Sequence, residues 1–274
     1  MANIFTGYPH CIVLYRFESG ALGIDSKGGN DLDVTGVAAE TTDYKEGAGC
    51  GDFEASESDH LFILDADLDA GFPLKNGDAT KKISMCFWFK AESLPANEES
   101  IYLFSKYRYD WPTDPATRHT WQVRLFSTAD KTRLRVDLGI GNGSIGLPVT
   151  ILADDLTAVQ ILAGRWYHLG IAYDDAHPET VVTRLWDDSD SVLYTNNDGD
   201  GWEGENVYIS DLPIAIGGLC SYPWPTWSKH FDGLIDEMVI FNDVLTTSEI
   251  DQIRSGTFGA GSGGGANMML GFNF

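Results

Sequence analysis

Apolar residues recur at every second position over several long stretches, and this alternation constrains the fold of the chain more than any other feature. In residues 132–140, leucine, valine and isoleucine alternate with arginine, aspartate and glycine, which is typical of a strand with one buried face. In residues 82–90 both alternating sets are largely apolar, which predicts a strand buried on both faces. Similar patterns predict strands at residues 11–17, 60–64, 101–106, 120–126, 166–173, 181–186, 212–216 and 231–242.

This run of strands without alternating helices predicts an all-β sandwich or jelly roll, and 274 residues suit one large domain of that class. One short helix is predicted at residues 246–254. Thr246 and Glu249 fit a capping box at its start, and Gly256 can end it. We therefore expect residues 1–258 to form an all-β jelly-roll sandwich with one short C-terminal helix.

The charge balance restricts the partners of the chain. Lysine and arginine number 18 against 41 aspartate and glutamate residues, which gives a net charge of −23. Phosphate backbones and anionic lipid surfaces are repelled by such a charge, so we expect no nucleic acid and no membrane insertion. The chain has no basic and apolar leader, and we expect no ordinary secretory export. The four cysteines form no CxxC pair and are predicted to be buried thiols.

The composition changes abruptly at the C-terminal end, where we separate a segment at residues 259–274. Residues 259–265 are only glycine, alanine and serine, which predicts a flexible linker. Large apolar residues follow it: Met268, Met269, Leu270, Phe272 and Phe274. This tail either folds back on the sandwich or docks into a neighbouring chain. Because a flexible linker permits reach to an adjacent subunit, we predict a homo-oligomer assembled through the tail.

Several short motifs resemble one family in their order along the chain. They are Tyr15-Arg16-Phe17-Glu18, Ile24-Asp25-Ser26-Lys27-Gly28, Gly47-Ala48-Gly49, Asp52-Phe53-Glu54, Phe87-Trp88-Phe89, Gly164-Arg165-Trp166-Tyr167-His168 and Phe231-Asp232-Gly233-Leu234-Ile235-Asp236-Glu237. Over residues 10–257 they are similar to laminin G-like (LamG) domains of the concanavalin A-like lectin/glucanase superfamily. The resemblance implies a concanavalin A-like jelly roll whose concave face or rim loops bind glycans or proteins, often with a structural calcium ion.

The resemblance also implies where calcium would bind. In such a jelly roll the first and last strands are neighbours, so Asp25 and Asn30, in the loop after the first strand, could meet Asp236 in the last. Because Asp236 and Glu237 adjoin in one predicted strand, we expect their carboxylates to point to opposite faces. Residues 196–201 match the first half of a calcium-binding loop but lack its later glutamate, which favours a plain acidic turn.

Two loops carry aromatic residues outside the strand pattern. They contain Tyr107, Tyr109, Trp111, Tyr222, Trp224 and Trp227. Exposed rings of this kind can stack on the faces of sugars, and proline on both sides of Trp224 stiffens its loop. Alternatively, these rings cover the sandwich or pack against another subunit. Trp88 and Trp166 lie within predicted strands and are expected to anchor the core.

The sequence motifs give little support for catalysis. A retaining glucanase on this fold needs paired carboxylates about 5 Å apart, usually in a Glu-x-Asp-x-x-Glu string, and no such string occurs. The acidic residues within 40–46 are three positions apart, so the alternation of a strand would direct their side chains to both faces of a sheet. The six histidines show no metal-binding spacing. We therefore expect no enzyme, and a glycoside hydrolase is the alternative if two carboxylates converge in a cleft.

Together these observations predict a non-catalytic surface recognition or structural module that binds glycans or neighbouring subunits. An adhesin-type fold without an export signal, ending in an apolar tail, fits a virion surface protein, either a decoration or a tail-associated protein assembled in the cytoplasm before release. Export by a signal-free secretion route is an alternative that also gives an extracellular location.

Overall fold

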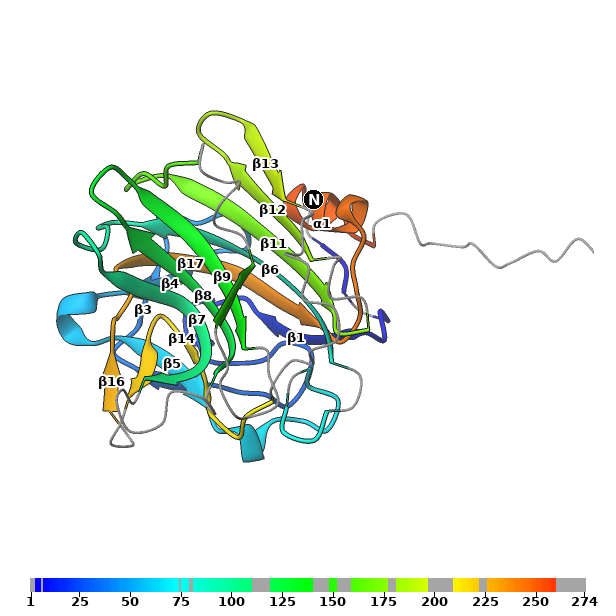
Figure 1. Cartoon of the computed structure of the whole chain (residues 1–274). Helices are drawn as coiled ribbons and strands as arrows, with labels where there is room; N and C mark the ends of the chain where they lie inside the picture. The colour runs from blue at the N-terminus through cyan, green and yellow to red at the C-terminus, as the bar shows by residue number, and fades with distance from the viewer. Residues whose placement is uncertain are drawn as a thin grey trace, which may run out of the picture.

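The computed structural model of the chain describes residues 3–5, 7–73, 75–78, 81–109, 119–139, 148–151, 159–176, 181–196, 209–221 and 226–259. Within these residues two β-sheets pack face to face, and the helix α1 (Thr247–Arg254) lies against the outside of one of them (Figure 1). The expected all-β sandwich with a short C-terminal helix is therefore confirmed.

The sheet that carries α1, here called sheet I, is antiparallel and has the strand order β13-β12-β11-β6-β17-β4-β3, with β1 also paired to β17. Its strands are β1 (Cys11–Tyr15), β3 (Ala38–Glu40), β4 (Cys50–Phe53), β6 (Lys82–Ala91), β11 (Trp166–Asp174), β12 (Val182–Asp187), β13 (Val192–Asn196) and β17 (Gly233–Phe241). The first and last strands of the chain are thus neighbours, as the resemblance implied.

The opposite sheet, here called sheet II, has the strand order β10-β9-β8-β7-β14-β5-β2. Its strands are β2 (Asp33–Thr35), β5 (His60–Ile63), β7 (Ser100–Tyr109), β8 (His119–Ser127), β9 (Thr132–Gly139), β10 (Pro148–Ile151) and β14 (Ile214–Ile216). Two further strands, β15 (Leu219–Ser221) and β16 (Thr226–Ser228), pair with each other beside β7. Among the described pairings of β15 and β16, the pairing of β15 with β7 is parallel and that of β15 with β16 is antiparallel.

The core between the sheets follows the alternation of the sequence. In β6, Ile83 and Phe87 point into the core, whereas Cys86 points outward and is covered by α1. β6 is therefore buried on both faces, as predicted. Gly170 of β11 permits the close approach of α1, because a Cβ at this position would lie 2.2 Å from Cγ2 of Ile250.

α1 begins with the predicted capping box. The backbone amide of Glu249 donates to the hydroxyl of Thr246 at 3.2 Å, and the amide of Thr246 donates to the Glu249 carboxylate at 2.8 Å. Two N–H groups at the start of the helix are thereby satisfied. The cysteines also agree with the sequence prediction, since all four are buried thiols: Cys11, Cys50, Cys86 and Cys220.

Candidate functional site

Two segments that are rich in aromatic residues approach each other at one end of sheet II. The first lies at the end of β7, and the second follows β15 and continues into β16. β15 pairs in parallel with β7, with Cys220 opposite Arg108 and Ser221 opposite Tyr109. Tyr109 in the first segment is therefore the neighbour of Ser221, which immediately precedes the second. We call the ends of β7 and β15 together with β16 the aromatic edge.

Trp227 is the predicted ligand residue of the aromatic edge whose side chain the structure describes. It lies in β16, and its ring centre is 4.4 Å from that of His60 and 5.1 Å from that of Phe62. His60 and Phe62 alternate in β5 with Leu61 and Ile63, which face the core, so Trp227 packs on the outer face of sheet II. Its half-buried ring covers the sheet and also offers exposed aromatic surface.

The other predicted ligand residues are described less completely. The backbones of Tyr107 and Tyr109 belong to β7 and pair with His119 and Ser221, respectively. Trp111, Tyr222, Trp224 and the side chains of Tyr107 and Tyr109 lie outside the described residues. Of the two predicted aromatic segments, the structure therefore brings together the backbone of residues 107–109 and 226–227, through β15.

Asp25 and Asn30, two of the predicted calcium ligands, lie together in the loop after β1. Oδ1 of Asp25 accepts hydrogen bonds from the amides of Leu14 and Lys27, at 3.0 and 2.9 Å. Its Oδ2 accepts from the backbone and side-chain amides of Asn30, at 3.3 and 3.2 Å. The side-chain oxygen of Asn30 accepts from the amide of Asp69 at 2.8 Å. These oxygens are thus engaged in fixing the loop, and the pair does not fit an open cation site.

Asp236, the third predicted ligand, lies in β17 and bonds to a different loop. Its Oδ2 accepts from the amides of Lys45 and Glu46, at 2.8 and 2.9 Å. Its Oδ1 is buried and has no hydrogen-bond partner among the described residues. The next residue, Glu237, accepts a hydrogen bond of 2.8 Å from Arg16. The predicted ligands therefore divide into two separately bonded groups, and calcium binding stays a prediction of the sequence.

The expectation that Asp236 and Glu237 point to opposite faces of their strand is corrected by a β-bulge. Ile235 and Met238 face the core, whereas Val239 faces outward. The pairing of β17 with β6 shifts between Asp236 and Val239, and Glu237 has a φ of 47°. Glu237 is therefore the extra residue of the bulge, and neither carboxyl group points into the core between the sheets.

Burial dominates the protonation of this pair. It raises the pKa of Asp236 to about 7 and the pKa of Glu237 to about 8. The neighbouring Glu46 carboxylate raises both pKa values further, while Arg16 lowers that of Glu237. Residues 196–201, the second predicted calcium loop, lie outside the described residues except for the backbone of Asn196.

Another cluster of acids bears on the hydrolase alternative. One carboxylate oxygen from each of Asp52, Glu54 and Glu92 lies within 4.8 Å of the others. Burial and neighbouring carboxylates raise the pKa of Asp52 to about 6. Such a separation suits a retaining glycosidase. However, Phe53 faces the core, so Asp52 lies on the outer face of sheet I. None of the three acids lines the cavity that the described residues form there.

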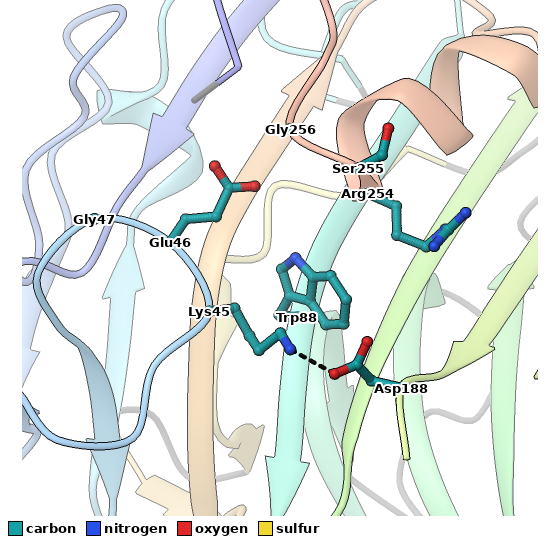
Figure 2. A pocket seen from close by; sticks show the side chains of 8 residues that line it. All are labelled: Lys45, Glu46, Gly47, Trp88, Asp188, Arg254, Ser255 and Gly256. Atoms are coloured by element: carbon teal, nitrogen blue, oxygen red, sulfur yellow. Dashed lines mark hydrogen bonds and ion pairs between the residues drawn. The ribbon is translucent and has the colours of Figure 1, made fainter. Parts of the chain in front are cut away.

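That cavity, of about 440 Å³, opens on the outer face of sheet I (Figure 2). It lies between the loop that precedes β4, the turn that follows β12 and the C-terminal end of α1, with a tryptophan of β6 between them. We call it the Trp88 cavity. Its lining residues are Lys45, Glu46, Gly47, Trp88, Asp188, Arg254, Ser255 and Gly256.

Cations and aromatic rings organise the walls of the Trp88 cavity. The ammonium of Lys45 lies 4.5 Å from the ring centre of Trp88 and 2.6 Å from Oδ2 of Asp188. On the opposite wall the guanidinium of Arg254 lies 4.0 Å from the ring centre of Trp186. Trp186 also donates its indole N–H to Asp188 at 3.1 Å. Two cation–π contacts therefore hold the walls in place.

Trp88 and Trp166 differ from the core anchors that the sequence predicts. Trp88 is 5% exposed, but it packs on the outer face of sheet I beside His168, with ring centres 4.9 Å apart. Trp166 is half-buried and donates its indole N–H to Asp43 at 2.8 Å. The outward phase of Trp88 in its strand was a readable signal for this site. The walls of the cavity could not be predicted from the sequence, because they come from segments that are far apart in it.

A family model for laminin G domains, described as the concanavalin A-like lectin/glucanases superfamily, matches residues 67–251. The chain belongs to this superfamily. The resemblance inferred from its motifs is thereby confirmed. No curated protein sequence matches this lectin/glucanase superfamily member.

Solved structures share the fold of this superfamily member. The binding domain of botulinum neurotoxin serotype D is 15% identical with a TM-score of 0.55, and the match covers 90% of this chain and 51% of that one. The serotype G binding domain is 13% identical with a TM-score of 0.53, covering 89% and 50%. The binding domain of botulinum neurotoxin DC in complex with SialylT is 10% identical with a TM-score of 0.50, covering 90% and 52%.

The chain spans about half the length of these toxin domains, and identities this low show a common fold alone. Among the described residues, no helix has the length and apolar character needed to cross a membrane.

Proposed function

We propose that this superfamily member is a non-catalytic recognition module that binds glycans at the aromatic edge. The proposal is supported by the parallel pairing of β15 with the end of β7, which sets Ser221 opposite Tyr109, and by the pairing of β15 with β16, which contains Trp227. The similar toxin domains are named as binding domains, and one of them is in complex with SialylT, which supports a recognition role on this fold.

The chemistry of the aromatic edge suits sugars. Aromatic rings offer flat apolar faces together with polar edges, and a sugar ring presents a face of C–H groups with hydroxyl groups around it. The prolines on both sides of Trp224 restrict the unbound loop, which reduces the entropy that binding must remove. Stacking on the Trp227 ring, which packs on His60 and Phe62 of sheet II, would therefore give affinity without a large conformational change.

The position of the acids favours binding over hydrolysis. Asp52, Glu54 and Glu92 approach one another closely enough for glycosidase chemistry but lie on the outer face of sheet I. The buried pair Asp236 and Glu237 is bonded to backbone amides and to Arg16. Neither group lies at the aromatic edge in sheet II, where the proposal places the glycan.

The proposed place of action is a particle or cell surface. An adhesin-type domain functions on a surface where it can contact glycans. The proposed virion role accounts for the combination of a recognition fold with an apolar C-terminal tail. Residues 260–274 of the tail segment lie outside the described residues, so assembly through the tail rests on composition. Many weak glycan contacts would gain avidity in such an assembly.

A glycan array probed with the full chain tests the proposed function, paired with an assay for sugars released from the glycans that bind. We expect binding without release. Trp227→Ala should reduce the array signal, whereas Trp166→Phe, a tryptophan change in sheet I, should preserve it. If sugar is released, and if Glu92→Gln abolishes this release, the non-catalytic proposal is overturned and a glycoside hydrolase is favoured.

A further inference from the structure

We infer that the Trp88 cavity is a second binding site, separate from the aromatic edge, for a neutral and hydroxyl-rich molecule of about the size of one sugar unit. The inference rests on the proposed function for the class of ligand, and on the lining residues for the site itself. The cavity of about 440 Å³ falls in the usual range for small-molecule sites, roughly 300–1,000 Å³.

The first observation is an unused hydrogen-bond donor in the cavity. Trp166 and Trp186 also lie on the outer side of sheet I, and their indole N–H groups donate to Asp43 and Asp188. The indole N–H of Trp88 makes no hydrogen bond within the described part of the chain. Figure 2 shows its nitrogen on the side of the ring that faces Glu46 and Ser255, away from the Lys45–Asp188 ion pair. A ligand in the opening would meet this donor.

The second observation is an acceptor across the opening from that donor. The side chain of Glu46 lines the cavity, and its Oε1 accepts a hydrogen bond of 3.1 Å from the side-chain amide of Asn3. Asn3 thereby fixes the position of the carboxyl group. A hydroxyl group can accept from the indole N–H of Trp88 and donate to a carboxylate. The cavity therefore offers both hydrogen-bonding partners that a polyol needs.

The charges of the lining favour an uncharged ligand. Lys45 and Arg254 carry positive charge, and Glu46 and Asp188 carry negative charge when ionised, so the formal charges balance. Asp188 is already paired with Lys45. Arg254 lies 3.9 Å from Oδ1 of Asp251, so an anionic ligand would have to compete for a cation that already has a carboxylate beside it, which is costly in a partly buried site. The net charge of −23 also repels anions at long range.

The third observation is that the walls are already fixed. Arg254 stacks on Trp186, and Asp251 in the same helix accepts a 3.1 Å hydrogen bond from Arg184 of β12. The helix end is thus tied to sheet I, while Lys45 is tied to both Trp88 and Asp188. A pre-formed site loses little side-chain entropy on binding, so a small ligand with few contacts can still be held.

The indole N–H signals of the ¹⁵N-labelled full chain test this inference, because Trp88 and Trp227 report the cavity and the aromatic edge separately. The probes are the methyl glycosides of glucose, galactose and mannose, with glucuronate and glucosamine as charged counterparts. We expect at least one neutral glycoside to shift the Trp88 signal saturably. We expect weaker shifts with the charged sugars.

Two variants and a matched control complete the test. Glu46→Gln, followed through the Trp88 signal, should weaken binding about tenfold, because it removes a charged hydrogen-bond acceptor. Trp88→Phe, followed by calorimetry, should weaken binding several-fold. Trp166→Phe makes the same change in a neighbouring strand outside the cavity and should leave the affinity unchanged.

Three results would overturn the inference. One is a Trp88 signal that no neutral sugar shifts, and another is tighter binding of the charged sugars. The third is an equal loss of affinity in the Trp88→Phe and Trp166→Phe variants, which would assign the effect to the fold. If the Trp88 signal stays constant while the Trp227 signal shifts with a glycan, the second site is wrong and the proposed function stands. If Trp88 responds and the aromatic edge binds no glycan, the cavity remains a site and the proposed function fails.

Discussion

Glu237 occupies the extra position of a β-bulge immediately after Asp236, so that neither carboxyl group of this adjacent pair points into the core between the sheets. Both groups are nevertheless buried, and one oxygen of each has no hydrogen-bond partner among the described residues. An ionised carboxylate without enough donors is costly in such a place, and this cost favours the protonated form.

The pair predicts a stability that decreases towards alkaline pH. Burial raises the pKa of Asp236 to about 7 and that of Glu237 to about 8, above their values in an unfolded chain. The folded chain therefore holds more protons, and its stability is lost as pH rises through these values. In the presence of a chelator, we expect the free energy of unfolding to fall by roughly 4–6 kcal/mol between about pH 5 and pH 8.

Asp236→Asn provides the comparison for this pH dependence. The carboxamide keeps an oxygen for the amides of Lys45 and Glu46 but does not titrate. Denaturant unfolding should therefore show a smaller pH dependence for the variant. An equal slope in both proteins, or a free energy of unfolding that does not change over this range, would contradict the account of the buried pair.

Asp25 is expected to stabilise the loop after β1 through hydrogen bonds to protein amides. Asp25→Asn should lower Tm with and without a chelator, because an amide nitrogen cannot accept the hydrogen bonds that a carboxylate oxygen accepts from N–H groups of Leu14, Lys27 and Asn30. Thermal melts measure this directly. If a chelator lowers the Tm of the unaltered chain and has no effect on Asp25→Asn, calcium binds at Asp25, as the sequence predicts.

The capping box gives a prediction for α1. Thr246→Ala removes the hydroxyl that accepts from the Glu249 amide and should cost about 1 kcal/mol of stability. Chemical denaturation measures the change, and Thr246→Ser, which keeps the hydroxyl, is the matched control. A Ser variant as unstable as the Ala variant would show that the hydroxyl does not stabilise the helix.

The tail predicts a change in mass. Deletion of residues 260–274 removes the apolar segment that we propose docks into a neighbouring chain, and it retains every described residue. Size-exclusion chromatography with light scattering should show an oligomer for the full chain and a folded monomer for the truncated chain. Identical masses would contradict assembly through the tail.

The strands were predictable because their long alternating runs express a physical requirement of a two-sheet core. The predicted strand at 82–90 corresponds to β6, and that at 132–140 corresponds to β9. In β6 the outward-facing Cys86 is buried because α1 covers it, which agrees with the prediction that this strand is buried on both faces. Short strands such as β2 and β3 were not predicted, because three residues are too few to show a period.

The candidate site was less predictable because it depends on pairings between distant segments. Composition identified Tyr109 and Trp227, but only the register of β15 against β7 brings their segments together. The bulge at Glu237 was not predictable either, because one inserted residue shifts the phase of a strand without changing its composition. Trp88 was assigned to the core because a tryptophan within a strand is usually a core anchor, although the alternation of β6 sets Trp88 on the face opposite Phe87.

The most direct test of the central claim is the affinity of the full chain for its strongest array glycan, measured by titration calorimetry on the unaltered chain and on Trp224→Ala and Trp227→Ala. Base stacking on aromatic rings, as a rough guide, is worth about 1–3 kcal/mol, so each variant should weaken binding by roughly five- to more than a hundred-fold. Circular dichroism should show an unchanged fold. Binding at the aromatic edge is contradicted if both variants keep the full affinity, or if the chain binds no glycan at all.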